Sequence, residues 1–248
     1  MTSPVAPIAS QLLNLHEDAK SVITEAAEKN AAKLGRLVQF DMDIVAWVER
    51  ITGRPEQRQL RDGRHNLGYA IYSASSGLYV QAYASLRLFL ELSFASIYFS
   101  ANELHRRKWA ANRADFSWAK ALDEKEGVLS PNFVREFSES ASIDASSYAL
   151  SAARCYRHCS EFVHGKLAVT ESLPETLSYS QEVMTDWIDT AIFASEAVLY
   201  LIYSRYGDEL LPIDDGQLSA TLEDAFYHLR QIRQRIGLPV EEVHHHGQ

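Results

Sequence analysis

Hydrophobic residues recur at helical spacing along most of the chain. Residues 8–34 carry apolar positions three or four residues apart in a background rich in Ala, Glu and Lys, and residues 37–51 continue the pattern. This spacing places apolar side chains on one face of a helix. We therefore expect two amphipathic helices, followed by a charged loop over 52–66 that contains glycine and proline.

The next segment predicts one long buried helix over 68–102. Its part from Gly77 to Phe99 is the most apolar stretch of the chain and is long enough to span a membrane. Arg87 and Glu91 lie near its middle, and charges there are costly in lipid. The pattern therefore favours a helix inside a bundle.

Three more helices are expected over 144–163, 175–206 and 217–236. Asp144 is typical of a residue that begins a helix, and Gly165 and Gly207 are placed to end the first two. Together these segments predict an all-α fold, a bundle of about five to seven helices.

Composition supports this fold and limits the function. The chain has 248 residues, with eleven glycines, seven prolines and a hydrophobic content of 46%. So few turn-forming residues argue against a many-stranded barrel or sandwich, and so much apolar content argues against disorder. A net charge of −9 excludes a protein that coats nucleic acid by bulk charge.

We expect a cytoplasmic protein. Residues 1–10 lack the basic region and apolar run of a signal peptide. The only two cysteines, Cys155 and Cys159, would share the apolar face of one helix. Reduced thiols in a core are therefore expected, rather than a disulfide or a metal pair.

Motifs of several enzyme classes are missing from the sequence. It has no P-loop, no Rossmann glycine motif, no G-x-S-x-G elbow and no H-E-x-x-H zinc helix. A di-metal carboxylate bundle needs two E-x-x-H pairs, and the predicted helices supply only Glu161 with His164. We expect no metal and no cofactor.

The helix expected over 144–163 carries the best candidate for chemistry. On a helical wheel its two cysteines and Tyr156 share one apolar face, whereas Arg157 and His164 share the opposite face, with His158 at its margin. Arg157 and His164 are two turns apart, so their side chains project nearly parallel from Cα atoms about 10.5 Å apart. A guanidinium and an imidazole placed in this way can meet one phosphodiester.

Arg157-His158-x5-His164 resembles the R-(polar)-x4-5-H motif of HEPN domains. These are small helical bundles, and many are ribonucleases of toxin–antitoxin, CRISPR and anti-phage systems. Two further strings are similar to features of this group. Residues 160–165 match an S-x-x-V-H-G ending, and Arg87-x3-Glu91 resembles an R-x3-E helix.

The resemblance covers about residues 68–206. It implies a HEPN-like bundle within 61–240, preceded by a helical extension over 1–60 and followed by a disordered tail over 241–248. It also implies a metal-independent endoribonuclease that acts as a homodimer, with two motifs facing across a shared cleft.

In the implied reaction, His164 takes the proton from a ribose 2′-hydroxyl, and the oxygen attacks the adjacent phosphorus. Arg157 stabilises the charge that gathers on the phosphoryl oxygens. His158 orients the site or contacts phosphate, and Glu161 supports the site together with the R-x3-E helix. The products are 2′,3′-cyclic phosphate and 5′-hydroxyl ends. Imidazole suits the proton transfer because it titrates near neutral pH.

The densest basic segment, residues 105–113, is the expected RNA contact. Its cations are Arg106, Arg107, Lys108 and Arg113. Cations beside an aromatic ring such as Trp109 can hold a nucleic-acid strand. A solvated helix end explains the same cluster. Because the whole chain is acidic, we expect weak activity on free RNA and a requirement for a partner, such as an antitoxin or another defence protein.

Each candidate residue also has a purely structural interpretation. His164 can interact with the last carbonyls of its helix. Arg157 can form an ion pair with Glu161, four residues on, and Arg87 can do the same with Glu91. A second arginine and histidine of the same spacing, at positions 58 and 65, span a glycine in the predicted loop, and we discount them.

Two other functions stay open. The fold can serve as a non-catalytic interaction module that binds a partner or a nucleotide, or as a silent regulatory subunit of an effector pair. Burial of His164 within its own bundle would exclude the enzyme.

Overall fold

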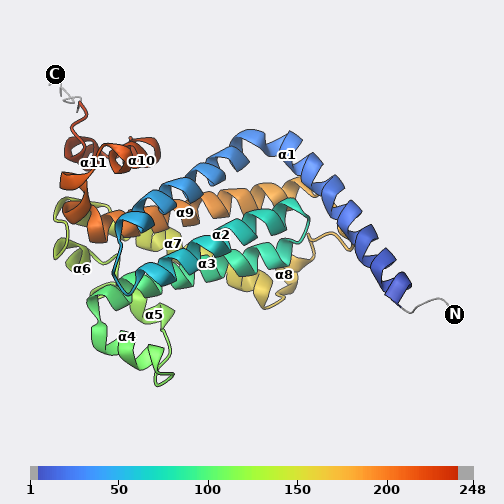
Figure 1. Cartoon of the computed structure of the whole chain (residues 1–248), viewed down its shortest axis with the longest axis horizontal. Helices are drawn as coiled ribbons and strands as arrows, with labels where there is room; N and C mark the ends of the chain where they lie inside the picture. The colour runs from blue at the N-terminus through green and yellow to red at the C-terminus, as the bar shows by residue number, and fades with distance from the viewer. Residues whose placement is uncertain (1–4, 240–248) are drawn as a thin grey trace.

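The computed structural model describes residues 5–239, and within this range the protein is all-helical. Five long helices form the body of the bundle (Figure 1): α1 (Val5–Arg50), α2 (Gln57–Ser75), α3 (Tyr79–Ala101), α7 (Ala145–Val163) and α9 (Gln181–Leu210). The shorter elements are α4 (Glu103–Ala110), α5 (Trp118–Ala121), α6 (Pro131–Arg135), η1 (Ser140–Ile143), α8 (Leu167–Thr170), η2 (Leu211–Ile213), α10 (Gln217–Phe226) and α11 (Arg230–Arg235). The predicted all-α bundle is confirmed, with more helices than expected because the connections contain short helices such as α4, α5, α6 and α8.

Helix α9 lies at the centre of the bundle and is apolar on almost every side. It contacts α1, α3 and α7, and its Trp187 and Tyr203 are fully buried. A helix that is hydrophobic all round needs neighbours all round. One continuous core runs from Ala26 to Ile232, so the second half of α1 shares it with the helices of the predicted 61–240 bundle.

The two helices expected over 8–34 and 37–51 form one helix, α1, that bends at Asn30. Asn30 has non-helical backbone angles (φ −128°, ψ 22°) and is buried. Its side-chain amide donates hydrogen bonds to the Ala26 carbonyl (3.1 Å) and to the Tyr179 hydroxyl (3.0 Å). The bend is thus fixed by a buried polar side chain. It directs the first part of α1 away from the body (Figure 1).

The predicted loop over 52–66 is wrong beyond its first residues, because α2 begins at Gln57. Gly63 does not break this helix. A Cβ atom there would lie 3.0 Å from the Ser93 hydroxyl oxygen and 3.5 Å from the Phe89 carbonyl. The glycine therefore lets α2 and α3 approach closely, a use of the residue that differs from turn formation.

The single long helix expected over 68–102 is also wrong, because the chain turns at Gly77. Gly77 has φ +79°, and the Leu78 amide donates to the Ser73 carbonyl (2.8 Å) in a Schellman closure. The segment is thus an α2–α3 hairpin. None of the helices within residues 5–239 combines the length and the apolar character needed to cross a membrane.

The three C-terminal predictions have different outcomes. The helix over 144–163 is confirmed as α7. The one over 175–206 is shorter at its start, where the Ser180 hydroxyl caps α9, and it continues through Gly207 to residue 210. Gly207 packs beneath the Tyr203 ring instead of ending the helix. The segment over 217–236 divides into α10 and α11.

Candidate functional site

Helix α7 presents Arg157 and His164 at the protein surface, and both side chains are exposed. His164 is the C-cap residue, and Gly165 follows with φ +61°. The Lys166 amide donates to the Glu161 carbonyl (3.0 Å), and the Gly165 amide donates to the Phe162 carbonyl (3.0 Å). This Schellman closure satisfies the helix end with backbone donors alone. The His164 ring makes no hydrogen bond to any residue in the range 5–239.

The ion pair considered for Arg157 does not form. Glu161 accepts a hydrogen bond from the Lys166 ammonium group (3.2 Å), and no carboxylate within the described residues pairs with Arg157. On a regular helix, Arg157 and His164 differ by only about 20° in direction. Both groups are therefore available on one exposed face. His164 is not buried within its own bundle, so the enzyme is not excluded.

His158 is held by a residue that the sequence did not indicate. Its Nε2 lies 2.6 Å from Asp186 Oδ2 at the start of α9. The Tyr83 hydroxyl of α3 donates to the same carboxylate. The Tyr83 ring stacks on Phe162 at 3.8 Å and meets the His158 ring edge-on at 5.4 Å. Three helices thus fix one imidazole.

This arrangement favours a charged His158. The hydrogen bond to Asp186 raises the pKa of His158, and the same bond lowers the pKa of Asp186. Burial raises the pKa of the Tyr83 hydroxyl, so this group remains a hydrogen-bond donor. The half-buried imidazole follows Arg157 in the sequence, and the Asp186 carboxylate favours its protonated form.

Arg87 and Glu91 form the expected mutual ion pair on α3, with 3.1 Å between Arg87 Nη2 and Glu91 Oε1. Tyr156 of α7 joins them. Its hydroxyl lies 2.7 Å from Arg87 Nη2 and 2.6 Å from Glu91 Oε1. The Tyr156 ring also stacks on Trp118 at 4.1 Å. The R-x3-E segment therefore contacts α7, the helix that carries Arg157, through Tyr156. The sequence predicts this tyrosine on the apolar face of the helix, and its hydroxyl makes the contact.

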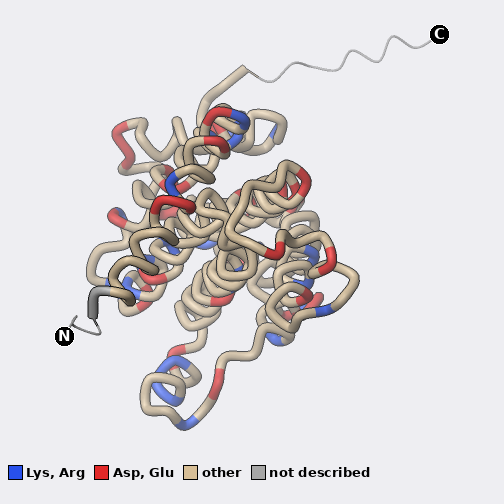
Figure 2. Tube along the Cα trace, turned by 90° about the vertical axis from the view of Figure 1, so that its right-hand side faces the viewer, with Lys and Arg blue, Asp and Glu red and all other residues tan. Residues whose placement is uncertain are grey.

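The basic segment lies on and just beyond α4, which projects from the body (Figures 1 and 2). Arg106 and Arg107 both pair with Glu103, at 2.6 Å each, and this holds the pKa of Glu103 at about 2. Lys108 and Arg113 form no ion pair within the described residues. Two of the four expected RNA contacts thus share one carboxylate of their own helix, which offsets one of their two positive charges.

The structure does not bring this segment to the α7 motif. His105 stacks on Tyr98 near the end of α3, whereas His158 meets Tyr83 near its start. The α3 segment between these tyrosines is roughly 22 Å long. One RNA strand would have to follow the whole of α3 to contact both regions.

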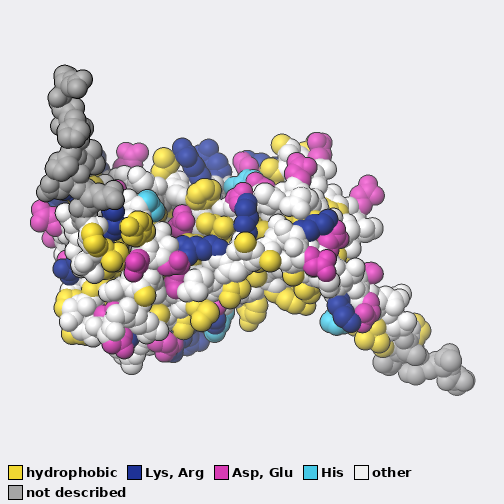
Figure 3. All heavy atoms as spheres, turned by 90° about the horizontal axis from the view of Figure 1, so that it is seen from above, with side chains coloured by type: hydrophobic (Ala, Val, Ile, Leu, Met, Phe, Trp, Pro, Cys, Tyr) yellow, Lys and Arg dark blue, Asp and Glu magenta, His cyan; other side chains and the backbone are white. Residues whose placement is uncertain are grey.

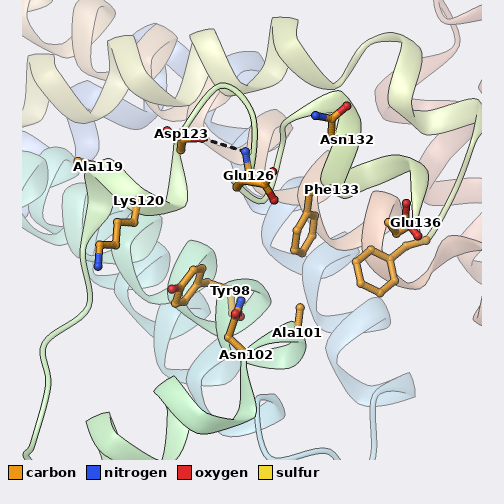
Figure 4. A pocket seen from close by; sticks show the side chains of 11 residues that line it. Tyr98, Ala101, Asn102, Ala119, Lys120, Asp123, Glu126, Asn132, Phe133 and Glu136 are labelled. Carbon is orange, nitrogen blue, oxygen red and sulfur yellow. Dashed lines mark hydrogen bonds between the residues drawn. The ribbon is translucent and has the colours of Figure 1, made fainter.

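A cavity of about 850 Å³ lies between the end of α3, α5 and α6 (Figure 4). None of the expected catalytic or RNA-contact residues lines it. Its wall carries one cation, Lys120, and three carboxylates, on Asp123, Glu126 and Glu136. This excess of negative charge is unfavourable for a polyanion.

The second pair of the same spacing, Arg58 and His65, does not lie in a loop. Both residues lie on α2, and both are exposed. Because the predicted loop is helical from Gln57 on, it gives no reason to discount this pair as a candidate site. The two pairs still differ, because Arg58 lies 4.0 Å from Asp62 and α2 offers no second histidine bound by a carboxylate.

Cys155 and Cys159 are confirmed as free, buried thiols on the apolar face of α7. Burial raises the pKa of Cys155 to about 12 and that of Cys159 further. Among residues 5–239, no three His, Cys, Asp or Glu side chains are grouped so that they can hold a metal ion. The predicted tail over 241–248 lies outside the described residues.

Comparison with protein-family models, curated proteins and solved structures finds no match to this chain. The resemblance to HEPN domains stays a prediction from the sequence.

Proposed function

We propose that this chain is a HEPN-like, metal-independent endoribonuclease, with Arg157 and His164 as its catalytic residues. The observation that carries the proposal is their exposure on one face of α7 with no protein partner within the described residues. An arginine without a carboxylate is free to bind phosphate. An exposed imidazole at a backbone-closed helix end is free to accept a proton.

His164 removes the proton from a ribose 2′-hydroxyl, and the resulting oxygen attacks the adjacent phosphorus. The bond from phosphorus to the 5′-oxygen breaks, and the leaving oxygen takes up a proton from solvent water, which leaves 2′,3′-cyclic phosphate and 5′-hydroxyl ends. Arg157 stabilises the charge on the phosphoryl oxygens. His158, whose pKa is raised by its hydrogen bond to Asp186, contacts the phosphate as a second positive group when it is protonated.

Lys108 and Arg113 are the proposed secondary RNA contacts, because they form no ion pair within the described residues. Arg106 and Arg107 would have to leave Glu103 first. With so little free positive charge, tight binding of RNA needs a second protein surface. We propose that the chain is a cytoplasmic homodimer, and that an antitoxin or defence-system partner supplies this surface.

The test is incubation of mixed RNA with the wild type, His164→Ala and Arg157→Ala, each with and without EDTA. We expect the wild type to cleave in EDTA and to leave cyclic phosphate ends, because the nucleophile is the 2′-oxygen. A 2′-deoxy substitution at a mapped cleavage position should stop cleavage there. Each variant should lose about 10²-fold or more in rate.

Equal cleavage by all three proteins would remove Arg157 and His164 from the reaction. An inactive wild type, with or without metal, would favour the interaction module.

A further inference from the structure

The first part of α1, residues 5–21, forms an arm that extends from the body (Figure 1). Its apolar side chains are not covered within the described residues. Ile8, Leu12 and Leu15 are 59%, 62% and 54% exposed. Figure 3 shows hydrophobic side chains beside the grey residues of the N-terminal end. Exposed leucines in a continuous row indicate an interaction surface.

The row has the spacing of a helix-pairing seam. Ile8, Leu12, Leu15 and Ala19 follow one another by four, three and four residues, which is the heptad pattern. The same face continues to Val22 and Ala26, which are buried against the protein's own body. The face thus has a partner at its inner end and lacks one along the arm.

The distribution of charge along the arm indicates which kind of partner covers its apolar row. Residues 5–15 contain no charged side chain. The charges of the arm, on Glu17, Asp18 and Lys20, lie off the row from Ile8 to Ala19. A helix that lies on a membrane surface is rich in Lys or Arg on its polar face, whereas this arm has one lysine and two carboxylates. A charged target would be desolvated against it with no compensation. An uncharged apolar helix is complementary, and a second copy of the chain supplies one.

The burial of Val22 and Ala26 at the inner end of the row determines whether two arms pair in parallel or antiparallel. Two arms in parallel would align both inner ends, so the two bodies would need the same space beside Val22 and Ala26. Antiparallel arms place the bodies at opposite ends of the pair. We propose that two copies associate through antiparallel arms, with Ile8 against the partner's Ala19 and Leu12 against the partner's Leu15. The overlap spans roughly 18 Å. This contact is independent of the proposed ribonuclease function, because bodies at opposite ends of the arm pair do not form the shared cleft that the HEPN resemblance implies.

Disulfide trapping tests the pairing directly. Ile8→Cys and Ala19→Cys are prepared as separate full-length proteins and mixed under mild oxidation. The two native cysteines are buried and do not compete. The mixture should form a covalent dimer, whereas Ile8→Cys alone should not, because its own copies lie roughly 16 Å apart along the pair. Ile213→Cys, at an equally exposed apolar position on another surface (74%), is the control.

Trapping of Ile8→Cys with itself would show parallel arms, and trapping no greater than with Ile213→Cys would show no pairing; either result overturns the proposal. A second measurement is sedimentation at about 100 µM. Leu12→Asp should weaken self-association by about tenfold or more, and Ile213→Asp should leave it unchanged. Equal behaviour of the two variants would also contradict the arm contact.

Discussion

At the scale of single residues, the pKa of His158 is raised by a carboxylate from another helix. Asp186 raises the pKa of His158, so the imidazolium stabilises the fold at low pH, and this contribution is lost as the pH rises through its folded pKa. His158 lowers the pKa of Asp186, so the contribution of that carboxylate is lost as the pH falls through its folded pKa. The pair is therefore most stabilising between about pH 4 and 6.5.

Asp186→Asn should lower the pKa of His158, because it removes the main cause of the upward shift. An NMR titration of the His158 ring measures this directly. In urea unfolding, the loss of stability relative to the wild type should be largest between about pH 4 and 6.5 and should shrink above the folded pKa of His158. His105→Ala, at an exposed histidine bound to a tyrosine, should leave the His158 titration unchanged. An unchanged titration in Asp186→Asn would contradict the role of the carboxylate.

The sequence predicted the exposed residues of the candidate site but not their partners. Helical period placed Arg157 and His164 on one face and the two cysteines on the other, because these positions share one helix. Asp186 approaches His158 from α9, and contacts between helices leave no periodic pattern. The Tyr156 ring packs against the core as its place on the apolar face predicts, but the contacts of its hydroxyl with Arg87 and Glu91 could not be read from helical spacing.

At the scale of elements, glycine was the main source of error. Gly77 and Gly165 have positive φ and end helices, whereas Gly63 and Gly207 lie inside helices where a side chain would collide with a neighbour. These two uses look the same in a single sequence. Helix boundaries near 57, 77 and 207 therefore could not be predicted, although the helical character of the segments could.

Gly77→Ala and Gly35→Ala should have opposite effects on stability. Gly77 has φ +79° and a carbonyl 3.3 Å from the position of a Cβ atom, so alanine should cost about 1–2 kcal/mol. Gly35 lies in the regular part of α1 with open space around it, so alanine should stabilise by about 0.5–1 kcal/mol. Thermal and urea unfolding of both variants measure the difference. Equal effects would show that Gly77 does not require the left-handed conformation.

At the scale of the whole molecule, the two parts of α1 have different roles. Phe40 and Trp47, after the bend, are fully buried, and the Trp47 indole donates to Thr221 of α10 at 2.8 Å. The part before Val22 lies outside the core. The predicted extension over 1–60 thus contains both a core helix and an exposed arm, a division that amphipathic spacing alone could not reveal.

Phe40→Ala should destabilise the protein by about 3–5 kcal/mol, because it empties a buried site. Leu12→Ala should change the free energy of unfolding by less than about 0.5 kcal/mol at low protein concentration, where the arm has no partner. Urea unfolding of the two variants provides the comparison. Similar losses in both would mean that the arm is part of the core.

The distribution of charge over the molecule also constrains RNA binding. The net charge of −9 argues against coating of nucleic acid by bulk charge, and the pairing of Arg106 and Arg107 with Glu103 reduces the free positive charge of α4 further. The sequence could not show that α4 lies far from the α7 motif along α3. That separation is a reason to expect a partner protein or a second subunit in any productive RNA complex.

His164 is the proposed proton acceptor in RNA cleavage, and His65 of the same chain is its matched control. His65 is exposed on a helix, seven residues after an arginine, as His164 is. The most direct measurement is the rate of RNA cleavage in EDTA by His164→Ala and by His65→Ala, with equal folding of both verified by circular dichroism. We expect His164→Ala to lose about 10²-fold or more and His65→Ala to match the wild type. Equal rates for the two variants, or a loss confined to His65→Ala, would contradict the claim.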